Sequence, residues 1–256
     1  MNPLFFGDSQ SPLFGIHQPP AAAGPDLGVV LCPPVAQEYI RTHWAFVQLA
    51  NQLSRAGVHV LRFDYFGVGD SAGASEEGTV ARWRSDITTA AQELRDLSGV
   101  RTISIVGLRL GAALAATTEG LKLQDLVLWD PVVSGVSYLK ALEAAHARML
   151  KDVDRFGGKR RPSCKGELVG FPLPPPMRDG IAELELLRAP RPAAERTVVV
   201  VSEERPEYAS LRDHFRAEYQ LLPPASRWEN RMESPDVLVS GPIVQAVTKT
   251  IAERTA

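Results

Sequence analysis

A strand, a turn and a helix near the middle of the chain constrain its fold most. Residues 101–118 read R-T-I-S-I-V-G-L-R-L-G-A-A-L-A-A-T-T, and residues 102–106 are an apolar run rich in β-branched side chains, as in a buried strand. Residues 112–116 are small and apolar, which is typical of a helix packed closely on a sheet. Gly107 and Gly111 lie between them. The stretch therefore predicts a strand that turns sharply into a helix.

Arg109 lies midway between these two glycines. In serine hydrolases the same strand-turn-helix arrangement carries a G-x-S-x-G sequence, whose central serine is the nucleophile. An arginine stays protonated at physiological pH and cannot attack a carbonyl. The residue that would make this chain a serine hydrolase is therefore missing from the position where the turn would place it.

Strands and helices alternate on both sides of this turn. Two short apolar pieces at 3–6 and 13–17 suggest an edge hairpin, and a further short strand is expected within 220–228. The alternation implies a doubly wound, mostly parallel α/β sheet, in which functional side chains gather after the C-terminal ends of strands. Buried-strand patterns occupy 27–32, 58–63, 126–129 and 197–201, and helical patterns occupy 37–56, 79–97, 206–219 and 241–251.

Residues 134–192 interrupt this alternation. They contain a helical pattern at 138–156, a basic stretch at 157–165 and a proline-rich apolar stretch at 171–177. We interpret the segment as a small lid inserted between two strands, and such lids usually shape a ligand pocket. Because 256 residues suffice for one α/β core with a modest insertion, we expect residues 1–256 to form a single domain.

Composition excludes several classes of function. The net charge of −2 offers no basic surface for nucleic acid, and no apolar run reaches the roughly 18 residues needed to span a membrane. Cys32 and Cys164 make neither a disulfide framework nor a metal motif, and the glycine-rich loop at 64–71 lacks the Gly-Lys-Ser/Thr of a phosphate-binding loop. The N-terminus does not resemble a secretory signal. We therefore expect a cytoplasmic protein with no cofactor and no metal.

Four motifs carry a resemblance to a known group of proteins. They are Q-E-Y-I-R-T-H at 37–43, F-D-Y-F-G-V-G-D-S-A-G at 63–73, V-G-L-R-L-G-A at 106–112 and L-W-D-P-V-V at 128–133. Together with the order of elements, they resemble the α/β-hydrolase fold superfamily in its serine aminopeptidase-like branch, and more narrowly the exosortase A system-associated hydrolase 2 group. The resemblance covers nearly the whole chain and is strongest from 32 to 138. It implies an α/β-hydrolase fold with a lid, and an association with exopolysaccharide or exosortase pathways.

The catalytic triad of the broad family can be checked position by position. The elbow holds Arg109 in place of serine, the acid position after the strand at 197–201 holds Glu203 or Glu204, and residues 228–241 contain no histidine. Two of the three members are therefore absent. Because loss of the nucleophile or the base lowers triad catalysis by a factor on the order of 10⁶, we do not expect conventional serine hydrolase activity.

Four residues near the C-terminal strand ends are candidates for a polar site. Arg109, at a helix N-terminus, would bind an anion, and Asp130 would hold its guanidinium through two parallel hydrogen bonds. His43 or Glu38, both on the first long helix, would transfer a proton. Two simpler interpretations stay open. Glu38 and Arg41 would form a surface pair beside a half-buried His43, or Arg109 and Asp130 would form a structural ion pair that fills a dead site.

Three functions are compatible with this pattern. The first is a hydrolase-like enzyme without a serine nucleophile, acting on a small acidic or acyl molecule with Arg109 as anion clamp. The second is an inactive pseudo-hydrolase that binds a small anion or acyl group, and the third is a scaffold in an exopolysaccharide or exosortase-linked pathway. The enzyme is placed first because buried polar residues are costly to keep without a ligand. Convergence of Arg109, His43 and Glu38 on one cavity would favour it, whereas a cavity without a base would favour the binding protein.

Overall fold

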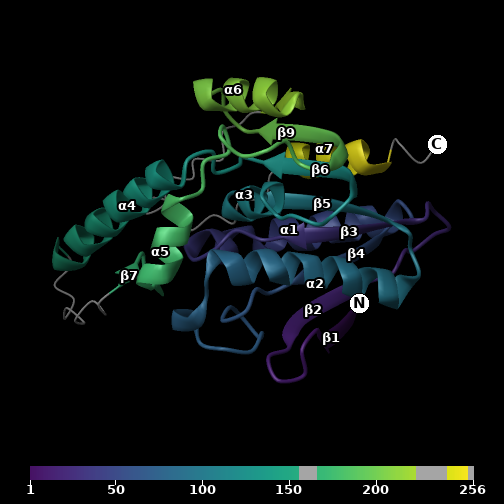
Figure 1. Cartoon of the computed structure of the whole chain (residues 1–256), viewed down its shortest axis with the longest axis horizontal. Coiled ribbons are helices and arrows are strands. Elements are labelled where there is room, and N and C mark those ends of the chain that lie inside the picture. Colours follow the sequence, from purple (N-terminus) through teal and green to yellow (C-terminus); the bar gives the residue numbers. More distant parts are fainter. Residues whose placement is uncertain (156–165, 223–240, 253–256) are drawn as a thin grey trace.

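A single large sheet organises the chain (Figure 1). The computed structural model describes residues 1–155, 166–222 and 241–252. Across the sheet the strand order is β1-β2-β4-β3-β5-β6-β9-β10, in which the neighbours from β4 to β10 pair in parallel and β1 and β2 form an antiparallel edge. The strands are β1 (Asn2–Phe6), β2 (Leu13–Gln18), β3 (Leu27–Cys32), β4 (His59–Phe63), β5 (Thr102–Leu108), β6 (Leu123–Trp129), β9 (Ala194–Val201) and β10 (Glu218–Leu221).

Helices cover both faces of the sheet. Those on one face are α1 (Gln37–Arg55) and α7 (Gly241–Ala252), and those on the other are α2 (Val80–Ser98), α3 (Leu110–Ala116) and α6 (Pro206–Phe215). The central strand β3 shows why two cores form. Its Val30 and Cys32 belong to the core beneath α2 and α3, whereas Val29 and Leu31 belong to the core beneath α1 and α7. Alternate side chains of a strand point to opposite faces, so a continuous apolar run is buried on both. The predicted doubly wound α/β sheet is confirmed.

The segment predicted as a lid contains two helices between β6 and β9. In Figure 1, α4 (Gly135–Arg155) extends away from one end of the sheet, and α5 (Pro175–Ala182) lies beside it, with the short strands β7 (Glu167–Leu168) and β8 (Phe171–Pro172) between them in sequence. Met177 and Ile181 of α5 are buried in the core shared with α2 and α3. Part of this insertion therefore belongs to the main core. Its basic stretch at 157–165 lies outside the described residues.

One helix was predicted too long. The pattern indicated a helix over 206–219, but α6 ends at Phe215 because Arg216 adopts a left-handed conformation with φ 51°. Glu218–Leu221 then forms β10, parallel to β9. The expected strand within 220–228 thus lies earlier in the chain, and most of that range is outside the described residues. Among the helices of the described ranges, none is long and apolar enough to cross a membrane.

Candidate functional site

The turn between β5 and α3 has a strained backbone. Arg109 has φ 54° and ψ −118°, a conformation that non-glycine residues rarely adopt. The flanking glycines are required by close backbone contacts. A Cβ on Gly107 would lie 2.5 Å from the Cα of Ala112, and a Cβ on Gly111 would lie 2.3 Å from the carbonyl oxygen of Cys32. The two glycines therefore let α3 follow β5 without a linker and hold residue 109 at the C-terminal end of the strand.

The Arg109 side chain lies in a buried ion pair. Arg109 is 7% exposed and Glu38 is 3% exposed. Nε of Arg109 donates a hydrogen bond to Oε1 of Glu38 at 3.3 Å. The Tyr138 hydroxyl donates to the other oxygen of Glu38 at 3.0 Å, and the guanidinium carbon lies 5.7 Å from the centre of the Tyr138 ring. One carboxylate thus bridges an arginine and a tyrosine that are far apart in sequence. The turn after β5 therefore presents a guanidinium that pairs with a buried carboxylate.

The electrostatics of the pair keep Arg109 charged. Burial alone would lower the pKa of the Arg109 guanidinium, but Glu38, together with smaller contributions from Tyr208, Tyr138 and Asp130, outweighs this effect, and the pKa is raised above its ordinary value. Burial, partly offset by the nearby Arg109 charge, also raises the pKa of Tyr208. Arg109 therefore cannot give up a proton in this environment, and it acts only as a fixed positive charge and hydrogen-bond donor.

Asp130 contacts Arg109 through its main chain. Nη1 of Arg109 donates to the Asp130 carbonyl oxygen at 3.1 Å. The Asp130 carboxylate accepts the Ser202 N–H and the Ser202 hydroxyl, each at 2.8 Å. Asp130 is 1% exposed and has φ 40°, a strained value that accompanies this turn after β6. Among the described contacts, the carboxylate that pairs with the guanidinium is that of Glu38, and the Asp130 carboxylate contributes to the raised pKa of Arg109.

His43 does not share the environment of the other three candidates. It lies exposed on α1, five residues after Glu38, with its ring edge against Trp44 at a centroid distance of 5.9 Å. It lines a cavity together with Tyr39 and Asp64, and neither Glu38 nor Arg109 lines that cavity. The structure thus brings Arg109, Glu38 and Asp130 together, and His43 lies beside a cavity that none of these three residues lines.

Two residues of the site were not anticipated from the sequence. Tyr138 comes from the first turns of α4, and Ser202 directly follows β9. The position of Ser202 after a central parallel strand was a usable signal, since such strand ends meet at one edge of the sheet. The neighbouring Glu203, proposed for the acid position, pairs with Arg205.

The glycine-rich loop after β4 braces itself. The Asp64 carboxylate accepts the Tyr39 hydroxyl at 2.6 Å and the Asp70 N–H at 3.1 Å. The Ser71 hydroxyl donates to the Asp64 carbonyl at 2.6 Å and accepts the Phe14 N–H at 2.8 Å. These bonds tie the loop to α1 and to β2, so Asp64 and Ser71 have structural partners, as a loop-bracing role requires.

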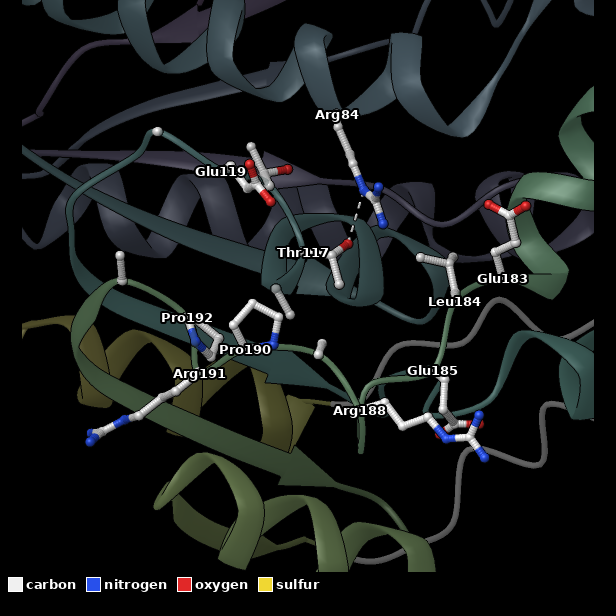
Figure 2. Close-up of a pocket in the computed structure, with 15 residues that line it drawn as sticks. Arg84, Thr117, Glu119, Glu183, Leu184, Glu185, Arg188, Pro190, Arg191 and Pro192 are labelled. Atoms are coloured by element: carbon white, nitrogen blue, oxygen red, sulfur yellow. Dashed lines mark hydrogen bonds between the residues drawn. The ribbon is translucent and has the colours of Figure 1, made fainter.

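A larger hollow lies at the far end of α3 from Arg109 (Figure 2). It measures about 490 Å³ and is bordered by Thr117, the end of the segment after α5, and Arg84 of α2. Figure 2 shows Arg84 reaching toward Thr117, to which its Nε donates at 3.0 Å, whereas Arg191 points away. Its charged residues are of both signs, namely Arg84, Arg188, Arg191, Glu119, Glu183 and Glu185. This mixed lining does not select one charge of ligand.

Comparison with solved structures identifies the fold. Mouse alpha/beta hydrolase domain-containing protein 10 superposes with a TM-score of 0.62 at 19% identity, covering 99% of this chain and 98% of that one. The bottromycin epimerase BotH, solved with bottromycin A2, gives a TM-score of 0.59 at 18% identity and covers the whole of both chains. This chain has the α/β-hydrolase fold. At these identities the likeness shows the fold alone.

Sequence comparison gives a narrower match. The human and orangutan (Pongo abelii) mitochondrial palmitoyl-protein thioesterase ABHD10 is 44% identical to this chain over 57 residues. The matched stretch is 22% of this chain and 19% of the relative. No protein-family model matches the sequence. Because the aligned stretch spans only about a fifth of the length of these curated relatives, their activity does not transfer to this chain.

Proposed function

We propose that this protein is a pseudo-hydrolase: an α/β-hydrolase-fold protein that binds a small acidic or acyl molecule without forming an acyl-enzyme. The observation that carries the proposal is the buried Arg109–Glu38 pair at the elbow. An arginine whose pKa is raised offers no nucleophile, and Glu38 is already bonded to both Arg109 and Tyr138. The side chains at this position neutralise each other, as expected of a structural ion pair.

A second candidate function keeps the elbow as a working site. In that hypothesis Arg109 is the anion clamp of an enzyme without a serine nucleophile, and Glu38 transfers a proton. The observation that favours it is that a guanidinium and a carboxylate meet at the C-terminal ends of the central strands, where functional side chains of such sheets gather. The solved relative BotH is named an epimerase, which supports the idea that this fold carries chemistry other than hydrolysis.

Probes of acyl-enzyme chemistry test the proposal directly. We expect no covalent labelling by a fluorophosphonate and no turnover of p-nitrophenyl acetate or butyrate above a heat-denatured control. Stoichiometric labelling of one residue would contradict the proposal. The second candidate requires that Glu38→Gln, which keeps the shape of the side chain, abolish any activity found with small acidic or acyl substrates; unchanged activity in that variant would eliminate Glu38 as the base.

The cellular role is proposed from the resemblance described above. Similarity to the serine aminopeptidase-like branch and to the exosortase A system-associated hydrolase 2 group supports a role in an exopolysaccharide or exosortase-linked pathway, where the protein would bind an intermediate or act as a scaffold. Deletion of the gene should then alter exopolysaccharide or sorted proteins at the cell surface. Unaltered levels of both would remove this part of the proposal.

A further inference from the structure

A second hollow, on the α1 face of the sheet, has the composition of a small-molecule site. It measures about 260 Å³, near the small end of the roughly 300–1,000 Å³ range of ligand pockets. It lies between the first turns of α1 and the strands β2 and β4, and its polar residues are Tyr39, Thr42, His43, Arg62, Asp64 and Asp70. Its apolar walls are Phe14, Ile16, Leu31, Pro33, Phe46 and Phe63. A mostly apolar enclosure with a few polar groups is the usual form of such a site.

Arg62 supplies the feature that selects a ligand. Its Nε is buried and makes no hydrogen bond in the structure, and Nη2 lies 3.9 Å from the sulfur of Met1. A thioether is a weak acceptor, and a buried donor without a partner is unfavourable because it has lost its hydrogen bonds to water. Burial also lowers the pKa of Arg62, although nearby Tyr39 and Asp64 oppose this effect. The guanidinium therefore has hydrogen-bonding capacity that the described residues leave unused.

The acidic side of the same cavity is already bonded. The Asp64 carboxylate accepts the Tyr39 hydroxyl and the Asp70 N–H, one on each oxygen. Burial raises the pKa of Asp64, despite these bonds and the nearby His43. Asp70 and His43 are exposed at the rim. The cavity thus offers one under-used cationic donor on β4, facing a carboxylate whose oxygens are taken up by the protein itself.

We propose that this cavity binds a small aryl or acyl carboxylic acid, with the ligand carboxylate on the Arg62 guanidinium and its apolar body against Phe14, Ile16 and Phe46. A carboxylate accepts parallel hydrogen bonds from a guanidinium, which would satisfy the buried donor. The inference rests on the proposed function in one respect, namely that the protein binds a small acidic or acyl molecule. It places that molecule beneath α1, away from the neutralised pair at the elbow.

Calorimetric titration with matched ligands tests the recognition of charge. Hexanoate and hexanamide share one pentyl chain, hexylamine places a cation on the same number of carbons, and benzoate and benzamide form an aromatic pair. We expect the two carboxylates to bind at least tenfold more tightly than their amides, and the amine to bind weakest. Equal binding of acid and amide would overturn the assignment of a carboxylate to Arg62, and so would an absence of binding by either acid.

Variants then locate the site. Arg62→Met keeps the length of the side chain and should weaken benzoate binding at least tenfold, and Ile16→Trp should do the same by filling the cavity. Arg101→Met is the matched control, because Arg101 is an exposed arginine at the start of β5; its affinity should equal that of the wild type. Thermal unfolding establishes that each variant is folded. Unchanged affinity in both Arg62→Met and Ile16→Trp would overturn the inference.

One further variant separates this inference from the proposed function. If Arg109→Met abolishes carboxylate binding while Arg62→Met leaves it intact, the ligand lies at the elbow, and the cavity inference fails although the protein still binds an acid. Conversely, labelling of the protein by a fluorophosphonate would contradict the proposal of a pseudo-hydrolase but would not affect the evidence that a carboxylate binds beside Arg62. The two failures are therefore distinguishable.

Discussion

Removal of the Glu38 carboxylate should destabilise the fold more than removal of any surface acid. In Glu38→Ala the Arg109 guanidinium, 7% exposed, would lose the carboxylate that neutralises it. Breaking one partner of a buried ion pair costs about 3–5 kcal/mol, because the remaining charge stays out of water. For a chain of this size each kcal/mol lowers the melting temperature by about 2–4 °C, so we expect a drop of roughly 6–20 °C.

Urea unfolding followed by circular dichroism measures the loss of unfolding free energy, and a thermal scan measures the fall in melting temperature. Asp213→Ala is the matched control, since Asp213 pairs with Arg212 at 2.8 Å but both side chains are exposed. Exposed pairs are screened by solvent and contribute little to stability, so this variant should unfold near the wild-type midpoint. If Glu38→Ala costs no more than Asp213→Ala, the pair is not desolvated and our account of the elbow is wrong.

A multiple variant separates the cost of leaving the Arg109 charge without its carboxylate from the cost of lost packing around Glu38. Replacing the whole polar group in Glu38→Leu/Arg109→Met/Tyr138→Phe removes both charges and the hydroxyl that contacts Glu38. Apolar replacement of a complete buried ion pair is often neutral or stabilising, so this variant should be more stable than Glu38→Ala alone. Equal or greater destabilisation in the multiple variant would show that packing around Glu38, and not the uncompensated charge, sets the cost.

Three other outcomes follow from the structure. Arg109→Ser should remain inactive toward p-nitrophenyl esters, because the loop before the last helix has no histidine to serve as base; saturable turnover would reveal a base that we have missed. Gly111→Ala should lower the unfolding midpoint sharply, since its Cβ would meet the Cys32 carbonyl oxygen at 2.3 Å, whereas Gly241→Ala, whose Cβ would have no atom of the described residues within 4 Å, should not. The pKa values of His17 and His59 are lowered by burial, so their contribution to stability should be complete above about pH 6.5 and should be lost as the pH falls below it. In His59→Phe the melting temperature should therefore fall less steeply between neutral and acidic pH. An unchanged dependence of the melting temperature on pH would show that these histidines do not cause the loss.

The fold was predictable because buried strands are short continuous apolar runs, whereas the helices repeat their apolar residues every three to four positions. The alternation of strands and helices, the edge hairpin and the sharp turn at Arg109 are all present. The error at the end of α6 has a local cause. The pattern continues as helix-compatible residues, but Arg216 adopts the left-handed conformation, which sequence rarely reveals for an arginine. β10 then pairs with β9, a tertiary contact that no local pattern contains.

The site was predictable only in part. Parallel strands bring Arg109 and Asp130 to one edge of the sheet, and α1 brings Glu38 there. The direction of each side chain was not predictable, because the positive φ of Asp130 presents its carbonyl oxygen to Arg109 while its carboxylate bonds Ser202. The separation of His43 from Glu38 could have been anticipated: five residues on a helix correspond to about 140° around its axis, so the two side chains point in different directions.

The strain at the elbow does not by itself favour an enzyme. A non-glycine residue in such a conformation costs about 1–3 kcal/mol and persists only where its surroundings enforce it. Here the surroundings are backbone contacts, since Gly107 packs on Ala112 and Gly111 packs on Cys32 whatever side chain residue 109 carries. The strained turn is thus imposed by the way α3 packs on β5. The side chain that this turn presents is Arg109, which pairs with the buried Glu38 carboxylate. The backbone conformation of the turn is therefore a property of the fold, whereas the Arg109–Glu38 pair depends on the particular side chains of this chain.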